Sequence, residues 1–504
     1  MTRIAIIGGG PAGYEPALVA ASLGADVTVI DRDGLGGACV LTDCVPSKTL
    51  IASSDRITRM SKAFRAGLVE FEDGGPSGSA GVAAGAGTDT TGERLPGKVR
   101  VDLTRVNARI KELAQQQSED ITARLAGEGI TVLQGTGRFA AEQPPRGHLL
   151  EVSDAGGVIT SRVEADVVLI ATGGTPRVLP TAVPDGERIL SWRDVYDLDD
   201  LPEHLVVIGS GVTGAEFASA YSELGVPVTL VSSRERVLPS EDPDAAEVIE
   251  RVFTQGGGTL VRKARASAVR REGDKVVVEL QSGGAPGNGG VAAGGGREVI
   301  GSHALMCVGS VPNTHGLGLE HIGVALDANG YIAVDRVSRT NVPSIYAAGD
   351  CTGVLLLASV AGMQGRIAMW HALGEAVQPL RLKTVAANVF THPEIATVGV
   401  GYGAITSGDV PARQVTLPLA TNARAKMSGD VEGFVKVYCR PATGVVVGAV
   451  VVAPNASELI FPLAMAVQQN LTVDDIAGTI GVYPSLSGSV AEAARQLMNH
   501  DDLD

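Results

Sequence analysis

The sequence predicts an α/β protein with two doubly wound, Rossmann-like nucleotide-binding domains and a separate α+β domain at the C-terminal end. Two observations support this fold class. Short Val/Ile-rich runs alternate with Ala-rich helical patterns over residues 1–60 and 205–260, as in βαβ units. The two stretches also resemble each other, since each passes through a strand, a glycine turn, a helix, Leu-Gly and a second strand. Two nucleotide-binding domains in one chain explain this most simply.

The first βαβ stretch carries a dinucleotide-binding fingerprint. Gly8, Gly10 and Gly13 directly follow the apolar run "RIAIIG" and open a helical pattern. Asp31 ends the next strand, at the spacing of a carboxylate that binds a ribose. Such glycines let the backbone approach a pyrophosphate at the positive end of the helix, so this segment is predicted to bind a dinucleotide rather than to form an ordinary turn.

The second βαβ stretch repeats the fingerprint with a different ending. Gly209, Gly211 and Gly214 follow "LVVIG", but the next strand ends at Ser232, Ser233 and Arg234 instead of an acid. Hydroxyls and a guanidinium would bind a 2′-phosphate, which a carboxylate would repel. The pattern therefore favours tolerance of, or preference for, NADPH. The alternative is that Arg234 is merely a solvated charge.

Outside these two stretches, the chain is predicted to contain two inserted loops and one further domain. Residues 73–97 and 283–296 are Gly/Ala-rich and are expected to be surface loops. A helix is expected over 101–128, and the last ~120 residues combine Val-rich strands with helices at 456–469 and 488–499. The predicted domains are 1–182 and 301–383 (first nucleotide domain, in two segments), 183–300 (second nucleotide domain) and 384–504 (C-terminal domain).

The composition and charge of the chain argue against nucleic-acid-binding, membrane-inserted and secreted proteins. The chain has 504 residues, 44% of them hydrophobic, and a net charge of −15, which disfavours nucleic acid and anionic membranes as partners. The N-terminus lacks the apolar core and the cleavage site of a signal peptide, and no apolar run of about 18 residues is present. Residues 354–373 come nearest but contain Gln364 and Arg366. A cytoplasmic protein without stable membrane insertion is expected.

Cys39 and Cys44 lie in the stretch "GGACVLTDCVPSK". A zinc site is disfavoured, because no second Cys/His pair with suitable spacing follows, and no metal is expected. A disulfide needs Cα atoms about 4.4–6.8 Å apart, whereas five residues of straight helix rise about 7.5 Å. The segment must therefore be bent, and a helix that starts near Pro46 would lower a thiol pKa. A redox-active pair is predicted, with inert buried thiols as the alternative.

Taken together, these motifs resemble the flavoprotein disulfide reductase family, which includes dihydrolipoamide dehydrogenase and glutathione reductase. The family pattern G-G-x-C-x-x-x-x-C-x-P-S-K is met from Gly36 to Lys48. Further similar segments are "ATGGTPR" (171–177), "VGSVPNT" (308–314), "IYAAGDCTG" (345–353) and "VFTHPEIATVG" (389–399). The resemblance runs from residue 4 to about 495 and implies an FAD domain, an NAD(P) domain, a C-terminal dimerisation domain and a homodimer.

The resemblance implies a role for each matching residue. Cys39 would attack the substrate, Cys44 would lie against the flavin as the charge-transfer thiolate, and Lys48 would pair with Glu216 near the flavin. Together with the fingerprints it assigns FAD binding to Gly8, Gly10, Ala12, Gly13, Asp31, Arg32, Gly37, Ala38, Cys39, Cys44, Lys48, Gly137, Ala171, Thr172, Gly173, Asp350, Leu357, Ala358 and Ser359. It assigns NADPH or NADH binding to Gly209, Gly211, Val212, Thr213, Gly214, Glu216, Ser232, Ser233, Arg234 and Gly309.

Four positions depart from the family pattern. Tyr483 and Gly488, in "YPSLSG", replace the His and Glu of the acid–base dyad that the partner subunit supplies. Val212 replaces an aromatic gate over the nicotinamide pocket, and Ser359 replaces a His near the second flavin motif. A phenol, with a pKa near 10, is a poor base at pH 7, and losing general acid–base help costs about 10²–10⁴-fold in rate.

A quinone needs no thiol protonation, because it can take a hydride or electrons from reduced flavin and protons from solvent or from Tyr483. The chain also resembles a branch of the family from actinobacteria that reduces quinones and shares "YPSLSGS". The expected function is thus FAD-dependent NAD(P)H:quinone oxidoreductase, with Cys39, Cys44, Lys48, Glu216 and Tyr483 as catalytic residues. The alternatives are a disulfide reductase with a replacement acid–base group, a transhydrogenase, and a non-catalytic flavin-holding subunit.

Overall fold

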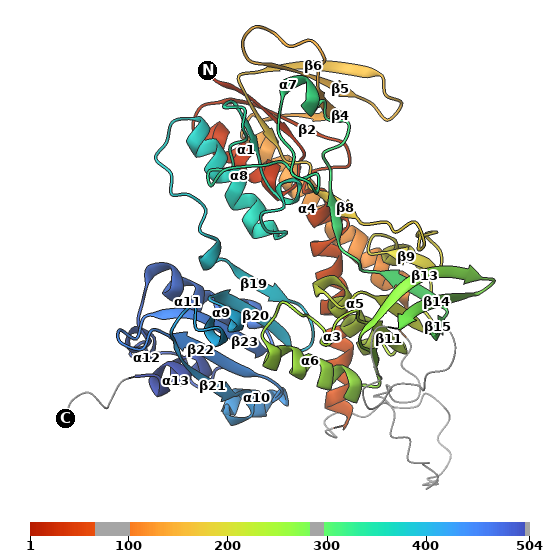
Figure 1. Ribbon diagram of the computed structural model, residues 1–504, viewed down its shortest axis with the longest axis vertical. Coiled ribbons are helices and arrows are strands. Elements are labelled where there is room, and N and C mark those ends of the chain that lie inside the picture. The colour runs from red at the N-terminus through yellow and green to blue at the C-terminus, as the bar shows by residue number, and fades with distance from the viewer. Residues whose placement is uncertain (66–100, 283–296, 499–504) are drawn as a thin grey trace, which may run out of the picture.

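The computed structural model describes residues 1–65, 101–282 and 297–498, so the two predicted Gly-rich loops lie outside the described residues. Its upper part is a five-stranded parallel sheet in the order β18-β7-β1-β2-β3 (Figure 1). The strands are β1 (Arg3–Ile7), β2 (Asp26–Asp31), β3 (Thr131–Gln134), β7 (Val167–Ile170) and β18 (Ile345–Ala347). Because β18 comes from far along the chain, two separate chain segments contribute to this sheet.

Helices cover this first sheet. The helices α1 (Pro11–Ser22) and α8 (Ala358–Ala372) pack against each other, and α4 (Leu103–Gly127) matches the helix expected over 101–128. A three-stranded antiparallel sheet of β4 (Thr136–Phe139), β5 (His148–Ser153) and β6 (Ile159–Ala165) completes the domain, with α7 (Leu319–Ile322) beside it. The apolar stretch 354–373 contains α8, and none of the described helices is long and apolar enough to cross a membrane.

The second domain repeats the parallel sheet. Its order is β12-β11-β10-β16-β9, with β9 (Ile189–Ser191), β10 (Leu205–Ile208), β11 (Val228–Val231), β12 (Thr259–Val261) and β16 (His303–Met306). The helices α5 (Val212–Glu223) and α6 (Pro243–Gln255) accompany it, and β13 (Ala264–Glu272), β14 (Lys275–Ser282) and β15 (Arg297–Gly301) form an antiparallel sheet beside it.

The predicted end of the second domain at residue 300 differs from the structure. Strand β16 begins at His303 and pairs in parallel with β10, so it belongs to the second sheet and not to the first domain. Strand β16 lies next to β10, on the side opposite β11. Its four residues were too short a pattern for the sequence to show which sheet the strand joins. The chain then crosses back through a two-stranded ribbon of β8 (Gly174–Pro176) and β17 (Ser310–Pro312).

The C-terminal domain is the predicted α+β unit. Its antiparallel sheet has the order β19-β20-β23-β22-β21, formed by β19 (Ala386–Val389), β20 (Glu394–Gly399), β21 (Arg413–Pro418), β22 (Phe434–Cys439) and β23 (Val446–Ala453). The helices are α9 (Tyr402–Thr406), α10 (Ala423–Ser428), α11 (Ala456–Gln469), α12 (Val473–Ala477) and α13 (Gly488–Gln496). The two helices expected from the sequence correspond to α11 and α13.

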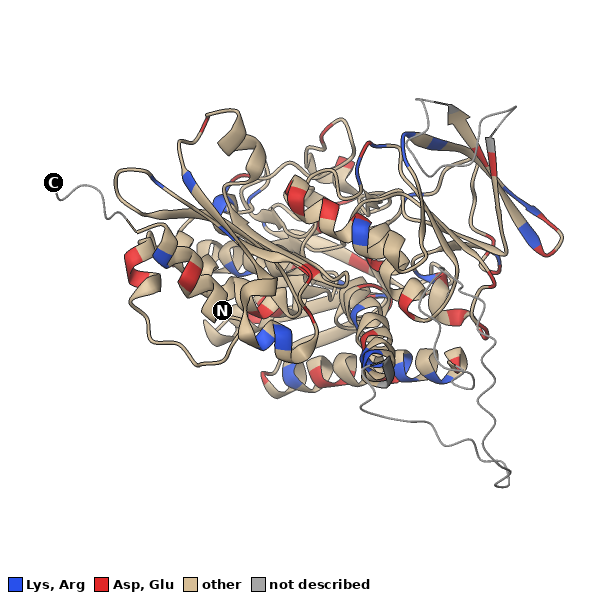
Figure 2. Cartoon of the chain, turned by 90° about the horizontal axis from the view of Figure 1, so that it is seen from below, with Lys and Arg blue, Asp and Glu red and all other residues tan. Residues whose placement is uncertain are grey.

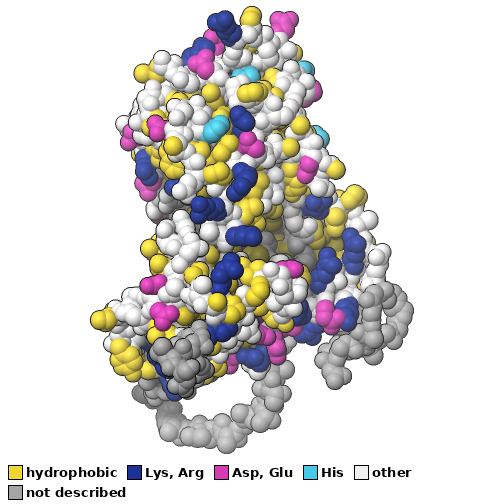
Figure 3. All heavy atoms as spheres, turned by 60° about the vertical axis from the view of Figure 1, so that its left-hand side comes forward, with side chains coloured by type: hydrophobic (Ala, Val, Ile, Leu, Met, Phe, Trp, Pro, Cys, Tyr) yellow, Lys and Arg dark blue, Asp and Glu magenta, His cyan; other side chains and the backbone are white. Residues whose placement is uncertain are grey.

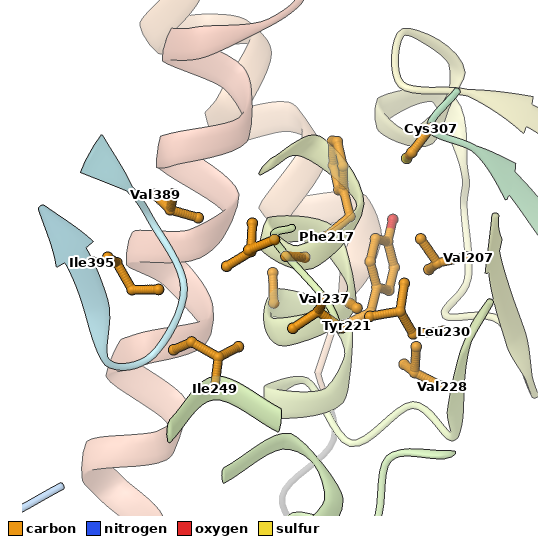
Figure 4. Close-up of a cluster of buried hydrophobic side chains, with 14 of the residues drawn as sticks. Val207, Phe217, Tyr221, Val228, Leu230, Val237, Ile249, Cys307, Val389 and Ile395 are labelled. Carbon is orange, nitrogen blue, oxygen red and sulfur yellow. The ribbon is translucent and has the colours of Figure 1, made fainter. Parts of the chain in front are cut away.

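One long helix and one shared core join the three parts. Helix α3 (Cys44–Arg65) runs down the middle of the molecule past the second and C-terminal domains (Figure 1). Buried apolar side chains of the second sheet and α5, such as Val207 and Phe217, continue into Val389 and Ile395 of β19 and β20 (Figure 4). Because burial of apolar surface is the main stabilising force, this core holds the domains in a fixed arrangement around α3.

Candidate active site

The first glycine turn is shaped to hold a dinucleotide. A Cβ on Gly8 would lie 2.2 Å from the carbonyl oxygen of Ala171, and one on Gly13 would lie 1.8 Å from that of Gly8. Both positions must therefore be glycine to let α1 begin so close to β1. Gly10, in contrast, has no atom nearer than 3.9 Å to such a Cβ. The middle glycine thus presents open backbone at the start of α1, which fits the pyrophosphate of FAD.

Asp31 fixes the loops around this turn. Its carboxylate accepts hydrogen bonds from the backbone N–H of Gly9 (2.6 Å), Asp33 (2.9 Å) and Gly34 (2.6 Å). Burial raises the pKa of Asp31, whereas these hydrogen bonds from the backbone act to lower it. The neighbouring Arg32 forms an exposed ion pair with Asp33 at 2.7 Å. The predicted ribose carboxylate therefore stands at the end of β2 and braces the glycine turn.

Residues that are far apart in the sequence but are all predicted to bind FAD lie close to this turn. Gly37 lies against Gly10, since a Cβ on Gly37 would be 2.9 Å from the Cα of Gly10. Asp350 lies beside Gly174, with its Cβ 3.5 Å from a Cβ placed there. Thr172 donates from Oγ1 to the carbonyl of Asn313 (2.6 Å) and receives the Asn313 amide on its own carbonyl (2.9 Å). The segments that the resemblance groups as one site are thus brought together.

The remaining predicted FAD residues take up positions on the same domain. Ala12 is buried in α1, Gly137 lies on β4 against Ile30, and Leu357, Ala358 and Ser359 form the beginning of α8. Asp350 follows β18, and burial raises its pKa to about 6, with a smaller contribution from Asp43. A carboxyl with that pKa can hold or release a proton near neutrality.

The second glycine turn has the same construction. A Cβ on Gly209 would lie 2.1 Å from the carbonyl of Cys307, whereas one on Gly211 would have nothing within 4 Å. Gly214 packs on Gly209, and Gly309 lies in the chain crossing after β16. The beginning of α5, with Val212 41% exposed and Thr213 next to it, is thus accessible to a second dinucleotide.

The residues after β11 divide into two kinds. Ser232 is buried, and its hydroxyl is within 2.7 Å of the Ser210 hydroxyl and donates to the backbone carbonyl of Arg234 at 3.1 Å. Ser233 and Arg234 are exposed. Ser232 therefore shapes the turn, and the other two side chains are the ones free to meet a nucleotide phosphate.

The cysteine pair lies in a bend between two helices. Cys39 is in α2 (Gly37–Leu41), and Cys44 is the first residue of α3, so the helix begins two residues before the predicted position near Pro46. Both thiols are free, and each shifts the pKa of the other. The bend between α2 and α3 brings the two sulfurs together, as a redox pair requires.

The two thiols act on each other's pKa. The neighbouring Cys44 thiol lowers the pKa of Cys39, which Lys48 also lowers. The Cys39 thiol and burial raise the pKa of Cys44. The lowered pKa suits Cys39 as the attacking sulfur, because the thiolate is the nucleophile. The role of Cys44 as the charge-transfer thiolate stays a prediction.

Lys48 and Glu216 form the predicted ion pair. Lys48 Nζ lies 2.8 Å from Glu216 Oε2, and Glu216 is buried. The other oxygen of Glu216 accepts the backbone N–H of Phe390 at 2.9 Å, and Lys48 Nζ lies 5.0 Å from the centre of the Phe390 ring. One carboxylate therefore links the dithiol helix, the second nucleotide domain and the C-terminal domain.

Asp43 is a charged residue of the site that sequence reasoning missed. It directly precedes Cys44, and its charge raises the pKa of both thiols. Burial raises its own pKa, and the positive charge of Lys48 opposes that effect. The signal was an acidic residue next to a thiol in a bend, but nothing in the residue pattern distinguished it from an ordinary polar turn residue.

The two C-terminal positions, Tyr483 and Gly488, are exposed and lie before and at the beginning of α13. Tyr483 is 85% exposed and has no hydrogen bond to a described residue. Gly488 begins α13 and donates its N–H to the Ser485 hydroxyl at 3.2 Å. Around Tyr483 other apolar side chains are also exposed, among them Ile480 and Val482. In residues 1–65, 101–282 and 297–498, no group of three or more His, Cys, Asp or Glu side chains could hold a metal ion.

Comparison with known proteins agrees with this geometry. Residues 2–365 match the family model of pyridine nucleotide-disulphide oxidoreductases, and residues 385–494 match that of their dimerisation domain. A protein of Mycobacterium tuberculosis named NAD(P)H dehydrogenase (quinone) is 55% identical over 100% of this chain and 95% of its own length. Dihydrolipoyl dehydrogenase of Bacillus subtilis is 32% identical, with 97% of each chain covered.

The solved structures lead to the same family. The crystal structure of LpdA from Mycobacterium tuberculosis matches with a TM-score of 0.88 and 54% identity, covering 99% of this chain and 100% of that one. Two glycine turns, a thiol pair in the bend before α3 and a C-terminal dimerisation domain are thus found together in one chain. The chain belongs to the pyridine nucleotide-disulphide oxidoreductase family.

Proposed function

We propose that this protein is an FAD-dependent NAD(P)H:quinone oxidoreductase with little or no activity toward lipoamide or glutathione disulfide. The observation that carries the proposal is the pairing of an intact Lys48–Glu216 site with Tyr483 and Gly488 where a disulfide reductase needs its acid–base dyad. The 55% identical relative, named for quinone reduction, supports it.

The proposed reaction transfers two electrons: NAD(P)H, a proton and a quinone give NAD(P)⁺ and a hydroquinone. FAD, when bound, would accept the hydride on one face and pass the electrons to the acceptor. The chain's own residues position the two partners. The glycine turns at Gly10 and Gly211 bind the two pyrophosphates, and the Glu216 carboxylate holds the Lys48 ammonium in place. Val212 leaves the nicotinamide pocket without an aromatic cover.

NADPH is the proposed preferred donor. Ser233 and Arg234 are exposed at the end of β11, where the ribose of the donor would lie. Arg234→Gln should raise KM for NADPH about tenfold, since hydrogen bonds to charged groups contribute about 1.5–3 kcal/mol, with little change for NADH. Equal changes for both nucleotides would contradict this preference.

We also place the enzyme in the cytoplasm as a homodimer. The match to a dimerisation domain and the exposed apolar residues of the C-terminal domain support the dimer. That domain forms the lower part of the face in Figure 3, where hydrophobic side chains are exposed. Free thiols at all five cysteines fit a reducing compartment.

A second candidate function is disulfide reduction with a replacement acid–base group. The neighbouring free thiols of Cys39 and Cys44 favour it, because a quinone reductase needs no reactive dithiol. One experiment separates the two candidates. The enzyme is reduced anaerobically with NADPH and mixed with oxidised lipoamide or with menadione while flavin absorbance is followed. Reoxidation by menadione alone is expected, and rapid reoxidation by lipoamide would contradict the proposal.

A further inference from the structure

Helices α3 and α4 enclose an open hollow of about 330 Å³ that begins next to the dithiol. The lining residues from α3 all lie on one face of that helix. The two lining residues from α4 are one helical turn apart. The lining residues are Val45, Lys48, Thr49, Ala52, Ser53, Arg56, Arg109 and Leu113. Val45 is next to Cys44, so one end of this hollow lies at the redox pair.

The hollow has a net positive charge. Three of its eight lining residues are cationic and none is acidic. Lys48 is neutralised by Glu216, but Arg56 and Arg109 form no ion pair or hydrogen bond with any described residue. In a protein with a net charge of −15, acidic and basic groups are elsewhere intermixed along the elements (Figure 2). Two unpaired guanidinium groups beside one hollow will therefore attract an anion.

Two other hollows of the described chain show the contrast. In the hollow of about 760 Å³ between α5, α6 and the C-terminal domain, Lys62 is paired with Asp430 at 2.7 Å. In a third, near β4 and β5, Arg138 and Arg162 share Glu151 at 3.0 and 3.2 Å. The Lys and Arg side chains that line those hollows are thus neutralised. Of the three hollows, only the one beside the dithiol has cationic side chains without a partner among the described residues.

The arginines are also the groups best able to donate to a ligand there. The Thr49 hydroxyl donates a hydrogen bond to the backbone carbonyl of Val45, and the Ser53 hydroxyl donates one to the backbone carbonyl of Thr49, both at 2.7 Å. Neither hydroxyl is therefore free to donate. A guanidinium, in contrast, presents five N–H groups in a planar fork that matches a carboxylate, sulfonate or phosphate.

We infer that this hollow binds an acceptor that carries an acidic group, with its anionic end at Arg56 and Arg109 and its reducible ring toward Lys48. The inference rests on the proposed quinone reductase function and specifies its substrate class. Arg56 lies eight residues beyond Lys48 in α3, a rise of about 12 Å. The acceptor is thus a planar quinone whose acid is set off from the ring by a chain of several carbons.

A matched pair of quinones tests this inference. One is a 1,4-naphthoquinone with a hexanoate side chain, and the other is the same compound as its uncharged primary amide. The two rings have the same redox chemistry, so the ratio of their kcat/KM values reports the charge alone. The holoenzyme should favour the acid at low ionic strength, and added salt should reduce the preference.

The variant Arg56→Gln/Arg109→Gln should lower the acid-to-amide ratio about tenfold or more, as expected for the loss of charged hydrogen bonds. Arg105→Gln is the matched control, because Arg105 lies one turn before Arg109 in α4 and is ion-paired with Asp102. It should leave the ratio unchanged. An unchanged acid-to-amide ratio in the double variant would overturn the inference, whether or not that variant remains a dimer in sedimentation.

The failure of this inference can be told from failure of the proposed function. If the holoenzyme reduces both quinones at equal kcat/KM, the function stands and the anionic acceptor is wrong. If it reduces neither quinone nor menadione, the quinone reductase function itself is wrong.

Discussion

Glu216 and Lys48, which are 168 residues apart in sequence, form a 2.8 Å ion pair in which the carboxylate is buried. The same carboxylate accepts the backbone N–H of Phe390. The first turn of the dithiol helix, the second nucleotide domain and the C-terminal domain are thus connected through one side chain. A substitution of Glu216 should therefore change the position of the Lys48 ammonium, which is expected to lie beside the flavin.

Glu216→Gln should slow reduction of the flavin by NADPH about tenfold or more, because Lys48 loses the partner that positions its charge. It should also lower the free energy of unfolding by about 2–4 kcal/mol, since a mostly buried lysine is left unpaired. Stopped-flow reduction and urea unfolding measure the two effects. Arg59→Gln, which breaks an exposed pair with Asp55 on the same helix, should change unfolding by less than about 1 kcal/mol. Similar losses in the two variants would argue against a special role for Glu216.

Asp43→Asn should make the dithiol more reactive. The Asp43 carboxylate raises the pKa of both Cys39 and Cys44, so its removal lowers both values and increases the thiolate fraction near pH 7. Each unit of pKa corresponds to about a tenfold change in thiolate. The rate of alkylation of the NADPH-reduced enzyme by iodoacetamide, measured from pH 6 to 9, should shift to lower pH. A profile that coincides with the wild type would show that Asp43 does not act on the thiols.

Asp350→Asn should stabilise the flavin-free protein above pH 6. Burial raises the pKa of Asp350 from 3.8 to about 6, so the folded chain binds the proton more tightly than the unfolded chain. Stability is therefore lost as pH rises between these two values, by about 1–3 kcal/mol. Melting curves at pH 4.5 and 7.5 should show this loss in the wild type and not in the variant. A variant with the same pH dependence would mean that another group is responsible.

The sequence predicted those parts of the molecule that depend on local spacing. The glycine turns at Gly8 and Gly209, the thiol pair and the helices α4, α11 and α13 all leave patterns within a few residues. The end of the second domain was placed too early, because β16 gains its identity only by pairing with β10. A four-residue apolar strand has no periodicity that shows which sheet it joins.

Contacts between distant charged residues were also beyond sequence reasoning. Nothing near Lys436 in sequence indicates that it is buried against Asp242, which caps the N-terminus of α6 and lies 194 residues earlier. The unpaired state of Arg56 and Arg109 likewise depends on which side chains the fold brings near, and not on the residues beside them in α3 and α4. Lys48 and Glu216 were matched only through the family resemblance, since neither position has a local pattern that points to the other.

Lys436→Met should destabilise the joint between the second nucleotide domain and the C-terminal domain. Lys436 is 1% exposed and contacts Asp242 at 2.8 Å and Asp244 at 2.6 Å. Removal of its charge leaves the buried Asp242 carboxylate without a cation, which costs about 3–5 kcal/mol. Urea unfolding measures this, with Lys426→Met on the short helix α10 as a control expected to change stability by less than about 0.5 kcal/mol. A loss below 1 kcal/mol at Lys436 would show that Asp242 finds another partner.

Tyr483→His/Gly488→Glu should restore disulfide reductase activity. The double variant places an imidazole and a carboxylate where the family resemblance puts the acid–base dyad, on the exposed segment that leads into α13. Because general acid–base catalysis contributes about 10²–10⁴-fold, lipoamide turnover should rise by at least about 10²-fold. Tyr483→Phe is the matched control: it removes only the hydroxyl, so slower menadione reduction in that variant would identify Tyr483 as a proton donor to the quinone. If the double variant gains no lipoamide activity although the enzyme remains dimeric and retains FAD, the missing dyad is not what prevents disulfide reduction in this protein.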